Sequence, residues 1–189
     1  MSLDDAVRSL EGGDAQTRRH ALARIAAEGS ARLTAPVAAL LHDDDEEVAA
    51  AAEATLWQIW GRAPDAATAE AFEEGLRLMQ VEDWPGAARA FSTCIDRAPE
   101  FAEGWNKRAT ARYLAEQYAL AVQDCETVVR LNPHHFGALS GQGLCHAALG
   151  QPTRAAACFR QALRVHPRLP GIRARLQAIE LERAKGNGH

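Results

Sequence analysis

The sequence predicts an all-α protein made of antiparallel helix pairs that stack as a helical-repeat solenoid. Its composition favours helices: 40 of the 189 residues are alanine and only 6% are aromatic, whereas strands are rich in aromatic and β-branched residues. Its prolines also recur at a fixed interval. Pro99, Pro133 and Pro167 lie 34 residues apart, and each closes a segment with helical apolar periodicity. A repeat of this length suits a pair of helices and a turn.

Residues 1–62 precede the repeats and show helical periodicity broken at three glycine- or aspartate-rich points. The segment VAALLHDDDEEVAAAAEATLWQIW resembles a HEAT repeat, with apolar residues along one face of its second helix at Val48, Ala52, Leu56 and Ile59. A fainter copy lies 31 residues earlier, at Thr17, Ala21 and Ile25. The resemblance implies two HEAT-like hairpins. Residues 63–67, around Pro64, are the expected joint to the repeats.

Counting back from each proline divides the next part into blocks of 68–101, 102–135 and 136–169. Small residues then share a register: the eighth place of each block holds Gly75, Ala109 and Gly143, and the twentieth holds Ala87, Ala121 and Ala155. Two helices that cross closely need small side chains at the crossing, which explains both places. Because proline cannot continue a helix, it ends the second helix of each pair.

The middle block, AEGWNKRATARYLAEQYALAVQDCETVVRLNP, resembles the tetratricopeptide repeat (TPR) family. It carries that family's pattern of a tryptophan at place 4, a small residue at place 8, a tyrosine at place 17, an alanine at place 20 and a proline at place 32. These are Trp105, Ala109, Tyr118, Ala121 and Pro133. The outer blocks depart from the pattern, with Ala71 at place 4 and polar Glu74 and Gln142 at place 7. The resemblance implies a right-handed solenoid whose first helices line a concave groove.

A final helix is expected at residues 170–185, followed by a tail at 186–189. Its apolar residues recur at steps of three and four, at Leu169, Ile172, Leu176 and Ile179. A stack of helix pairs leaves its last apolar face bare, so this amphipathic helix is expected to cap it.

The TPR resemblance implies a partner-binding groove. Mapped onto this sequence, its wall holds mostly apolar residues together with one amide and one cation: Phe72, Leu76, Met79, Asn106, Lys107, Thr110, Tyr113, Leu114, Ser140 and Leu144. The alternative is that several of them pack within the repeat. A TPR clamp for the acidic tails of Hsp70 or Hsp90 needs cations where this chain has Phe72, Gly137 and Gly141, so we do not expect that role.

Chemistry-bearing motifs are missing from the sequence. It contains no G-x-x-x-x-G-K-[ST], G-x-S-x-G or H-E-x-x-H, and its four cysteines form no C-x-x-C pair. The run Asp43–Asp45, and His134 and His135 near Cys145, could serve as metal ligands. Helix capping explains the aspartates better, and a core or solvated loop position explains the histidines better. We expect no catalysis, no metal and no cofactor. The cysteine spacing and acidic start favour a reducing compartment, the cytoplasm, or a plastid stroma in a photosynthetic eukaryote.

Charge is distributed unevenly along the chain. Residues 1–101 carry 19 acids and 9 bases, whereas residues 102–189 carry 6 acids and 12 bases. The last part contains a basic end formed by Arg160, Arg164, Arg168, Arg173 and Arg175. It could serve solubility, an acidic protein, RNA phosphates, or weak head-to-tail self-association of an otherwise monomeric chain.

Taken together, the sequence predicts a non-catalytic adaptor or assembly factor that binds a segment of another protein in the groove. The alternative is an RNA-associated helical-repeat protein that uses the basic end. No stretch is long and apolar enough to predict a membrane span.

Overall fold

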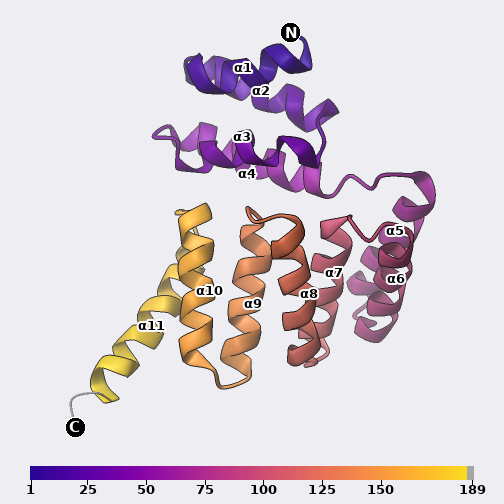
Figure 1. Cartoon of the computed structure of the whole chain (residues 1–189), viewed down its shortest axis with the longest axis vertical. Coiled ribbons are helices and arrows are strands. Elements are labelled where there is room, and N and C mark those ends of the chain that lie inside the picture. Colours follow the sequence, from indigo (N-terminus) through magenta and orange to yellow (C-terminus); the bar gives the residue numbers. More distant parts are fainter. Residues whose placement is uncertain (187–189) are drawn as a thin grey trace. The chain divides into compact units, whose positions relative to one another are not determined.

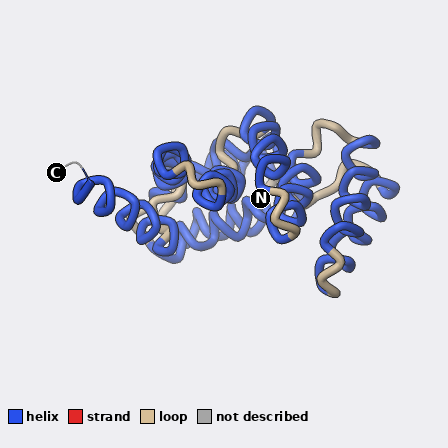
Figure 2. Tube along the Cα trace, turned by 90° about the horizontal axis from the view of Figure 1, so that it is seen from below, coloured by secondary structure: helices blue, strands red, loops and turns tan. Residues whose placement is uncertain are grey.

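The computed structural model describes residues 1–186, and all regular structure among them is helical (Figure 2). The predicted all-α helical-repeat class is confirmed. Most of the predicted tail, residues 187–189, lies outside the described residues. No helix in residues 1–186 combines the length and apolarity needed to cross a bilayer.

The chain divides into two compact units. One comprises Met1–Arg62 with Val165–Pro167, and the other comprises Ala63–Arg164 with the segment from Arg168 onward.

The first unit contains four α-helices and two short 3₁₀ turns. In chain order these are α1 (Leu3–Gly12), α2 (Ala15–Glu28), η1 (Ala31–Leu33), α3 (Thr34–Ala39), η2 (Leu40–His42) and α4 (Glu46–Trp60). The breaks fall at the three predicted points. Side-chain oxygens of Ser2, Asp14 and Asp45 cap α1, α2 and α4, respectively.

The predicted apolar face of α4 lies in the core of this unit. Val48, Ala52, Leu56 and Ile59 are all at most 1% exposed, and α4 packs against α2. Asp45 accepts hydrogen bonds from the backbone N–H groups of Glu47 and Val48, so part of the aspartate run acts as a helix cap. The HEAT-like nature of these hairpins stays a prediction.

The second unit is a row of antiparallel helix pairs followed by one more helix (Figure 1). The pairs are α5 (Ala66–Gln80) with α6 (Trp84–Arg97), α7 (Ala102–Leu114) with α8 (Tyr118–Leu131), and α9 (Phe136–Ala148) with α10 (Pro152–Val165); α11 (Pro170–Gly186) comes last. The second helix of each pair ends two residues before its proline, as the repeat predicts.

The crossing point within each pair is tightly packed. A Cβ added at Gly75 would lie 2.5 Å from the Phe91 ring, and one added at Gly143 would lie 2.4 Å from the Phe159 ring. The two phenylalanines occupy place 24 of their blocks. The middle block holds the larger Ala109 at place 8 and the smaller Cys125 at place 24. Place 8 is therefore small because place 24 is large, and the two sizes change together.

The turn inside each pair uses a left-handed residue at place 15. Glu82 and Glu116 have φ of 60°, and Gly150 has φ of 68°. A left-handed backbone favours glycine, and of these three turns only that of the third repeat has one, Gly150.

A partly buried ion cluster connects α7 to its neighbours α6 and α8. Arg108 donates to both carboxylate oxygens of Asp124 on α8, at 3.0 and 2.8 Å, and Arg112 donates to the same carboxylate at 2.7 Å. Arg108 also donates to Ser92 Oγ on α6, at 3.0 Å, and lies over the Trp105 ring. One carboxylate thus fixes two arginines of α7.

Helix α11 caps the array through the predicted stripe. Leu176 is buried against Ala155, Ala156 and Phe159 of α10, and Ile172 and Ile179 pack around this cluster.

Candidate functional site

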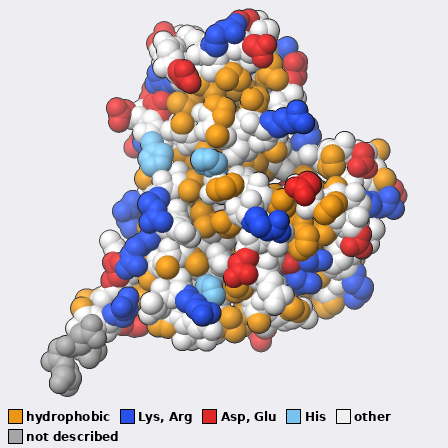
Figure 3. Space-filling model, in the orientation of Figure 1, with side chains coloured by type: hydrophobic (Ala, Val, Ile, Leu, Met, Phe, Trp, Pro, Cys, Tyr) orange, Lys and Arg blue, Asp and Glu red, His pale blue; other side chains and the backbone are white. Residues whose placement is uncertain are grey.

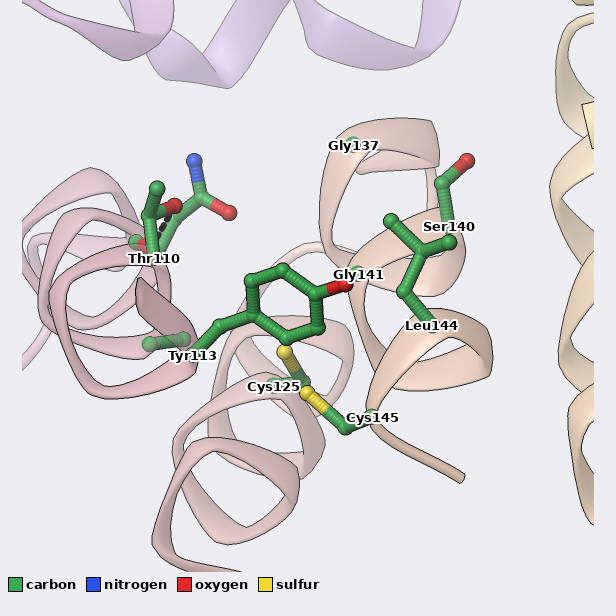
Figure 4. Close-up of a pocket in the computed structure, with 10 residues that line it drawn as sticks. Thr110, Tyr113, Cys125, Gly137, Ser140, Gly141, Leu144 and Cys145 are labelled. Carbon is green, nitrogen blue, oxygen red and sulfur yellow. Dashed lines mark hydrogen bonds between the residues drawn. The ribbon is translucent and has the colours of Figure 1, made fainter. Parts of the chain in front are cut away.

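A hollow of about 220 Å³ opens between α7 and α9 (Figure 4). It is lined by first helices of two consecutive repeats, and α8 contributes one residue. The lining consists of Asn106, Ala109, Thr110, Tyr113, Cys125, Gly137, Ser140, Gly141, Leu144 and Cys145. Its surface is predominantly apolar.

The hollow exists because α9 presents glycines on this side. Gly137 and Gly141 are one turn apart, and a Cβ added at Gly141 would meet nothing closer than Cys125 Sγ, at 3.7 Å. Tyr113 extends across the space with its hydroxyl toward Gly141, and the sulfurs of Cys125 and Cys145 lie next to its ring (Figure 4). At these two glycines of α9 a larger residue would fill the space with its side chain, and here that space stays open.

The two cysteines act as apolar walls. Burial raises the pKa of the Cys145 thiol to about 11 and raises the pKa of Cys125 as well. Thiols with such pKa values stay protonated at neutral pH and are poor nucleophiles. The arrangement therefore offers a soft, apolar surface.

A buried polar cluster lies beside the hollow, at the start of α7. Glu103 is 3% exposed and accepts hydrogen bonds from Asn106 Nδ2 at 3.1 and 3.2 Å. Its carboxylate also lies 3.3 Å from Lys107 Nζ and 2.9 Å from His135 Nε2. This cluster links α7 to the start of the next repeat, because His135, the last residue of block 102–135, is the N-cap of α9.

The hydrogen bonds of His135 assign its tautomer. Its Nδ1 accepts the backbone N–H of Ala138 at 3.1 Å and thereby caps α9, so the proton of the neutral ring is on Nε2 and is donated to Glu103. Burial works to raise the pKa of Glu103, but the hydrogen bond from His135, the charge of Lys107 and the bond from Asn106 outweigh it. The pKa of Glu103 consequently lies below its ordinary value.

The structure brings together half of the residues predicted for the groove. Asn106, Thr110, Tyr113, Ser140 and Leu144 all line the hollow. Lys107 lies next to it, paired with Glu103, and Leu114 is 41% exposed at the end of α7.

The predicted groove residues of α5 lie elsewhere. Phe72 is buried, with its ring centroid 5.6 Å from that of Phe91 and 5.3 Å from that of Phe101, so it is a core residue and not an available contact. Leu76 and Met79 are partly buried against the same cluster. Packing within the repeat, the alternative weighed for this set, describes these three residues.

The basic end lies on the last two helices of the second unit. Arg160 pairs with Glu180 at 2.7 Å, each about half exposed. Arg164, Arg168, Arg173 and Arg175 are exposed along α10, the following turn and α11. Basic side chains gather over these helices in the space-filling view (Figure 3).

Sequence reasoning missed two parts of the site. It left His135 as either a core or a solvated loop residue, and the structure shows that the side chain is fully buried and caps α9. It noted Gly137 and Gly141 only as positions without a cation, although missing side chains on a groove-facing helix also signal open space. No group of histidine, cysteine or acidic side chains suited to a metal ion occurs in the described part of the chain.

Known proteins resemble this chain over the repeats. It is 31% identical over 83 residues to a TPR repeat-containing protein of Rhizobium etli, covering 44% of this chain and 41% of that protein. It is 26% identical over 137 residues to the FK506-binding protein-like of Mus musculus, covering 68% and 40%. The chain thus spans about two fifths of the length of these relatives.

Solved structures share the fold at low sequence identity. The first TPR of Spaghetti (RPAP3), bound to the HSP90 peptide SRMEEVD, has a TM-score of 0.61 at 22% identity, over 62% of this chain and 94% of that one. The Sgt2 TPR domain from Aspergillus fumigatus has a TM-score of 0.63 at 18% identity, over 67% and 85%. A tetratricopeptide repeat family model matches residues 72–136 and 115–171, which together cover more than half of the chain. The prolines, the small crossing residues, the stacked helix pairs and this match agree, and the chain belongs to the tetratricopeptide repeat family.

Proposed function

We propose that the chain is a non-catalytic adaptor or assembly factor that holds an extended segment of a partner protein against the first helices of its repeats. The observation that carries this proposal is the apolar hollow between α7 and α9. It opens where two consecutive repeats meet, so a strand laid across them would place a side chain in it. The tetratricopeptide fold is typically a protein-interaction module, which supports this role.

Solved proteins of this fold add support. The RPAP3 domain is bound to an HSP90 peptide, and SycD is in complex with a peptide of the translocator YopD. The positions at which a clamp for acidic chaperone tails needs cations hold Phe72, Gly137 and Gly141 here. The partner we propose is therefore a protein segment other than such a tail.

The test is affinity capture from native lysate with the whole chain, run beside a variant that combines Tyr113→Ala with Lys107→Ala. Partners that use the groove are retained by the unaltered chain at high salt and lost from the variant, while circular dichroism shows both to be helical. A captured protein is then purified and its affinity for both chains is measured by calorimetry. Equal affinities would place binding outside the groove.

The basic end favours a second candidate, association with RNA. Five exposed arginines on and between α10 and α11 could contact phosphates. A salt titration separates the two candidates, since phosphate binding weakens log-linearly with salt concentration and apolar binding persists. The proposal also places the chain in the cytoplasm as a monomer or weakly self-associating protein, and light scattering over a concentration series tests the latter.

A further inference from the structure

The hollow between α7 and α9 has a chemistry that selects among peptide segments. This inference rests on the proposed function and concerns which segment fits. None of the ten described residues that line the hollow is charged, and most of the lining is apolar. A carboxylate moved there from water would lose its hydration with no cation among the lining residues to replace it.

The charged groups beside the hollow, at the start of α7, already pair with each other. Lys107 lies 3.3 Å from Glu103, whose carboxylate is buried and also bonded to Asn106 and His135. The positive charge beside the hollow is therefore balanced by a buried negative one. An acidic ligand gains little attraction from such a pair.

The amide of Asn106 is fixed in one orientation. A carboxylate can only accept hydrogen bonds, so Asn106 must turn its NH₂ group toward Glu103. The Oδ1 atom is then the part of this lining residue left for a ligand, and it accepts. Thr110 donates its hydroxyl proton to the backbone carbonyl oxygen of Asn106 at 3.0 Å, which leaves its Oγ1 as an acceptor as well.

Space and hydrogen bonding together describe the occupant. A volume of about 220 Å³ exceeds the roughly 150 Å³ of an apolar cavity that takes up benzene, so one large side chain fits. The Tyr113 ring, Leu144 and two protonated thiols would surround that side chain. The backbone N–H of an extended peptide, which needs an acceptor once buried, can be met by Asn106 Oδ1.

We propose that the hollow binds an internal, extended peptide segment by a single large neutral side chain, such as leucine, methionine or phenylalanine, and that Asn106 Oδ1 accepts a backbone N–H beside it. A free C-terminal carboxylate is not part of this recognition. The glycines of α9 determine how large the bound apolar side chain can be. Glu103 determines the orientation of the Asn106 amide, so that Oδ1 is available as an acceptor.

The experiment is a selection of random dodecapeptides displayed on phage, with the whole chain immobilised and the peptides followed by a constant segment so that no C-terminus is free. We expect the enriched peptides to share one large neutral apolar residue. The best peptide is then synthesised with both ends blocked and its affinity measured by fluorescence anisotropy. Replacing its apolar residue by aspartate should weaken binding about ten- to a hundredfold, the value of one buried apolar side chain.

Variants of the chain locate the effect. Gly141→Leu fills the hollow and should weaken binding of the blocked peptide by a similar factor. The matched control is Gly171→Leu, which adds the same side chain at an exposed glycine of α11 with no neighbour within 4 Å, and should leave binding unchanged. Tyr113→Ala removes one wall without filling the space and serves if Gly141→Leu fails to fold by circular dichroism.

A variant whose preference for apolar peptides is reversed gives a further readout. Gly141→Arg adds a cation to the hollow and should move the selected peptides toward acidic residues at the position of the apolar one.

The outcomes separate the two proposals. Acidic or free-carboxylate peptides that bind the unaltered chain and are lost on Gly141→Leu would overturn this inference and leave groove binding intact. Enriched peptides that bind Gly141→Leu and Tyr113→Ala as tightly as the unaltered chain, or the lack of any enrichment, would overturn both.

Discussion

Two alanine substitutions on α9, two residues apart, are expected to have opposite effects on stability. Both Gly141 and Gly143 lie in the interior of the helix, so each change to alanine gains about 1 kcal/mol in helix propensity. At Gly141 the new Cβ meets only Cys125 Sγ, at 3.7 Å, which is an ordinary contact. Gly141→Ala should therefore raise the unfolding free energy by about 1 kcal/mol.

At Gly143 the new Cβ would lie 2.4 and 2.5 Å from two atoms of the Phe159 ring. Carbon atoms pack at about 3.5 to 4 Å, so the ring or the helix must move by about 1 Å. Phe159 is fully buried and packed against Leu176 of the capping helix, which leaves it no room. Overpacking of this kind costs about 1–3 kcal/mol, and since the propensity gain cancels, the two variants should differ by this amount.

The assay is thermal and urea unfolding followed by circular dichroism. The melting temperature of Gly143→Ala should fall below that of Gly141→Ala by roughly 3 to 10 °C, with similar urea m-values. Gly75→Ala, whose Cβ would lie 2.5 Å from the Phe91 ring, should behave like Gly143→Ala. Equal melting temperatures for the Gly141 and Gly143 variants would refute the explanation of place 8 by the opposing ring.

Four more predictions concern the packing and electrostatics of the second unit and are tested by urea unfolding. Asp124→Ala leaves two partly buried arginines without their shared carboxylate and should cost about 3 kcal/mol; a loss below about 1 kcal/mol would contradict this. Glu116→Gly relieves a left-handed backbone with φ of 60° and should stabilise by about 1 kcal/mol, whereas no gain would show that the turn is unstrained. The pKa of Glu103 is lower in the folded state than its ordinary 4.5, so its carboxylate stabilises the fold above that pH and this stabilisation is lost as pH falls through the folded value. The unaltered chain should thus lose more stability than Glu103→Gln between pH 6 and pH 3, and parallel losses would argue against it. Leu176→Ala should cost about 2–3 kcal/mol and Leu181→Ala, 58% exposed in the same helix, less than about 0.5; equal effects would mean that α11 does not cap the array.

Periodic sequence features predicted the architecture well because they act locally. The three prolines stop helices wherever they occur, since the proline ring blocks the helical hydrogen bond. The small residues at places 8 and 20 report close helix crossings, and the structure shows the glycines of place 8 against buried rings. The stripe of Leu176 and its neighbours likewise follows from helical periodicity alone.

The candidate site could be predicted only in part. Helical spacing placed Asn106, Thr110 and Tyr113 on one face of α7, and the structure shows all three lining the hollow. The same register put Phe72 in the groove, but its ring lies between two other rings in the core. Register gives the direction of a residue from its helix, and only the neighbouring helices decide whether that direction ends in solvent or in a core.

By itself the sequence determined the helical class, the 34-residue repeat, the ends of the helices and the capping stripe, because these depend on residues close together in the chain. Tertiary structure alone decided that Glu103 meets His135 across 32 residues, that Asp124 holds two arginines, and that the glycines of α9 leave an open hollow. These features depend on where side chains far apart in the sequence or on different helices meet, and that distance is set by packing in three dimensions. The Asn106 amide, on which the proposed peptide preference depends, is oriented by Glu103 three residues earlier on α7, but only the tertiary structure shows that this carboxylate is buried.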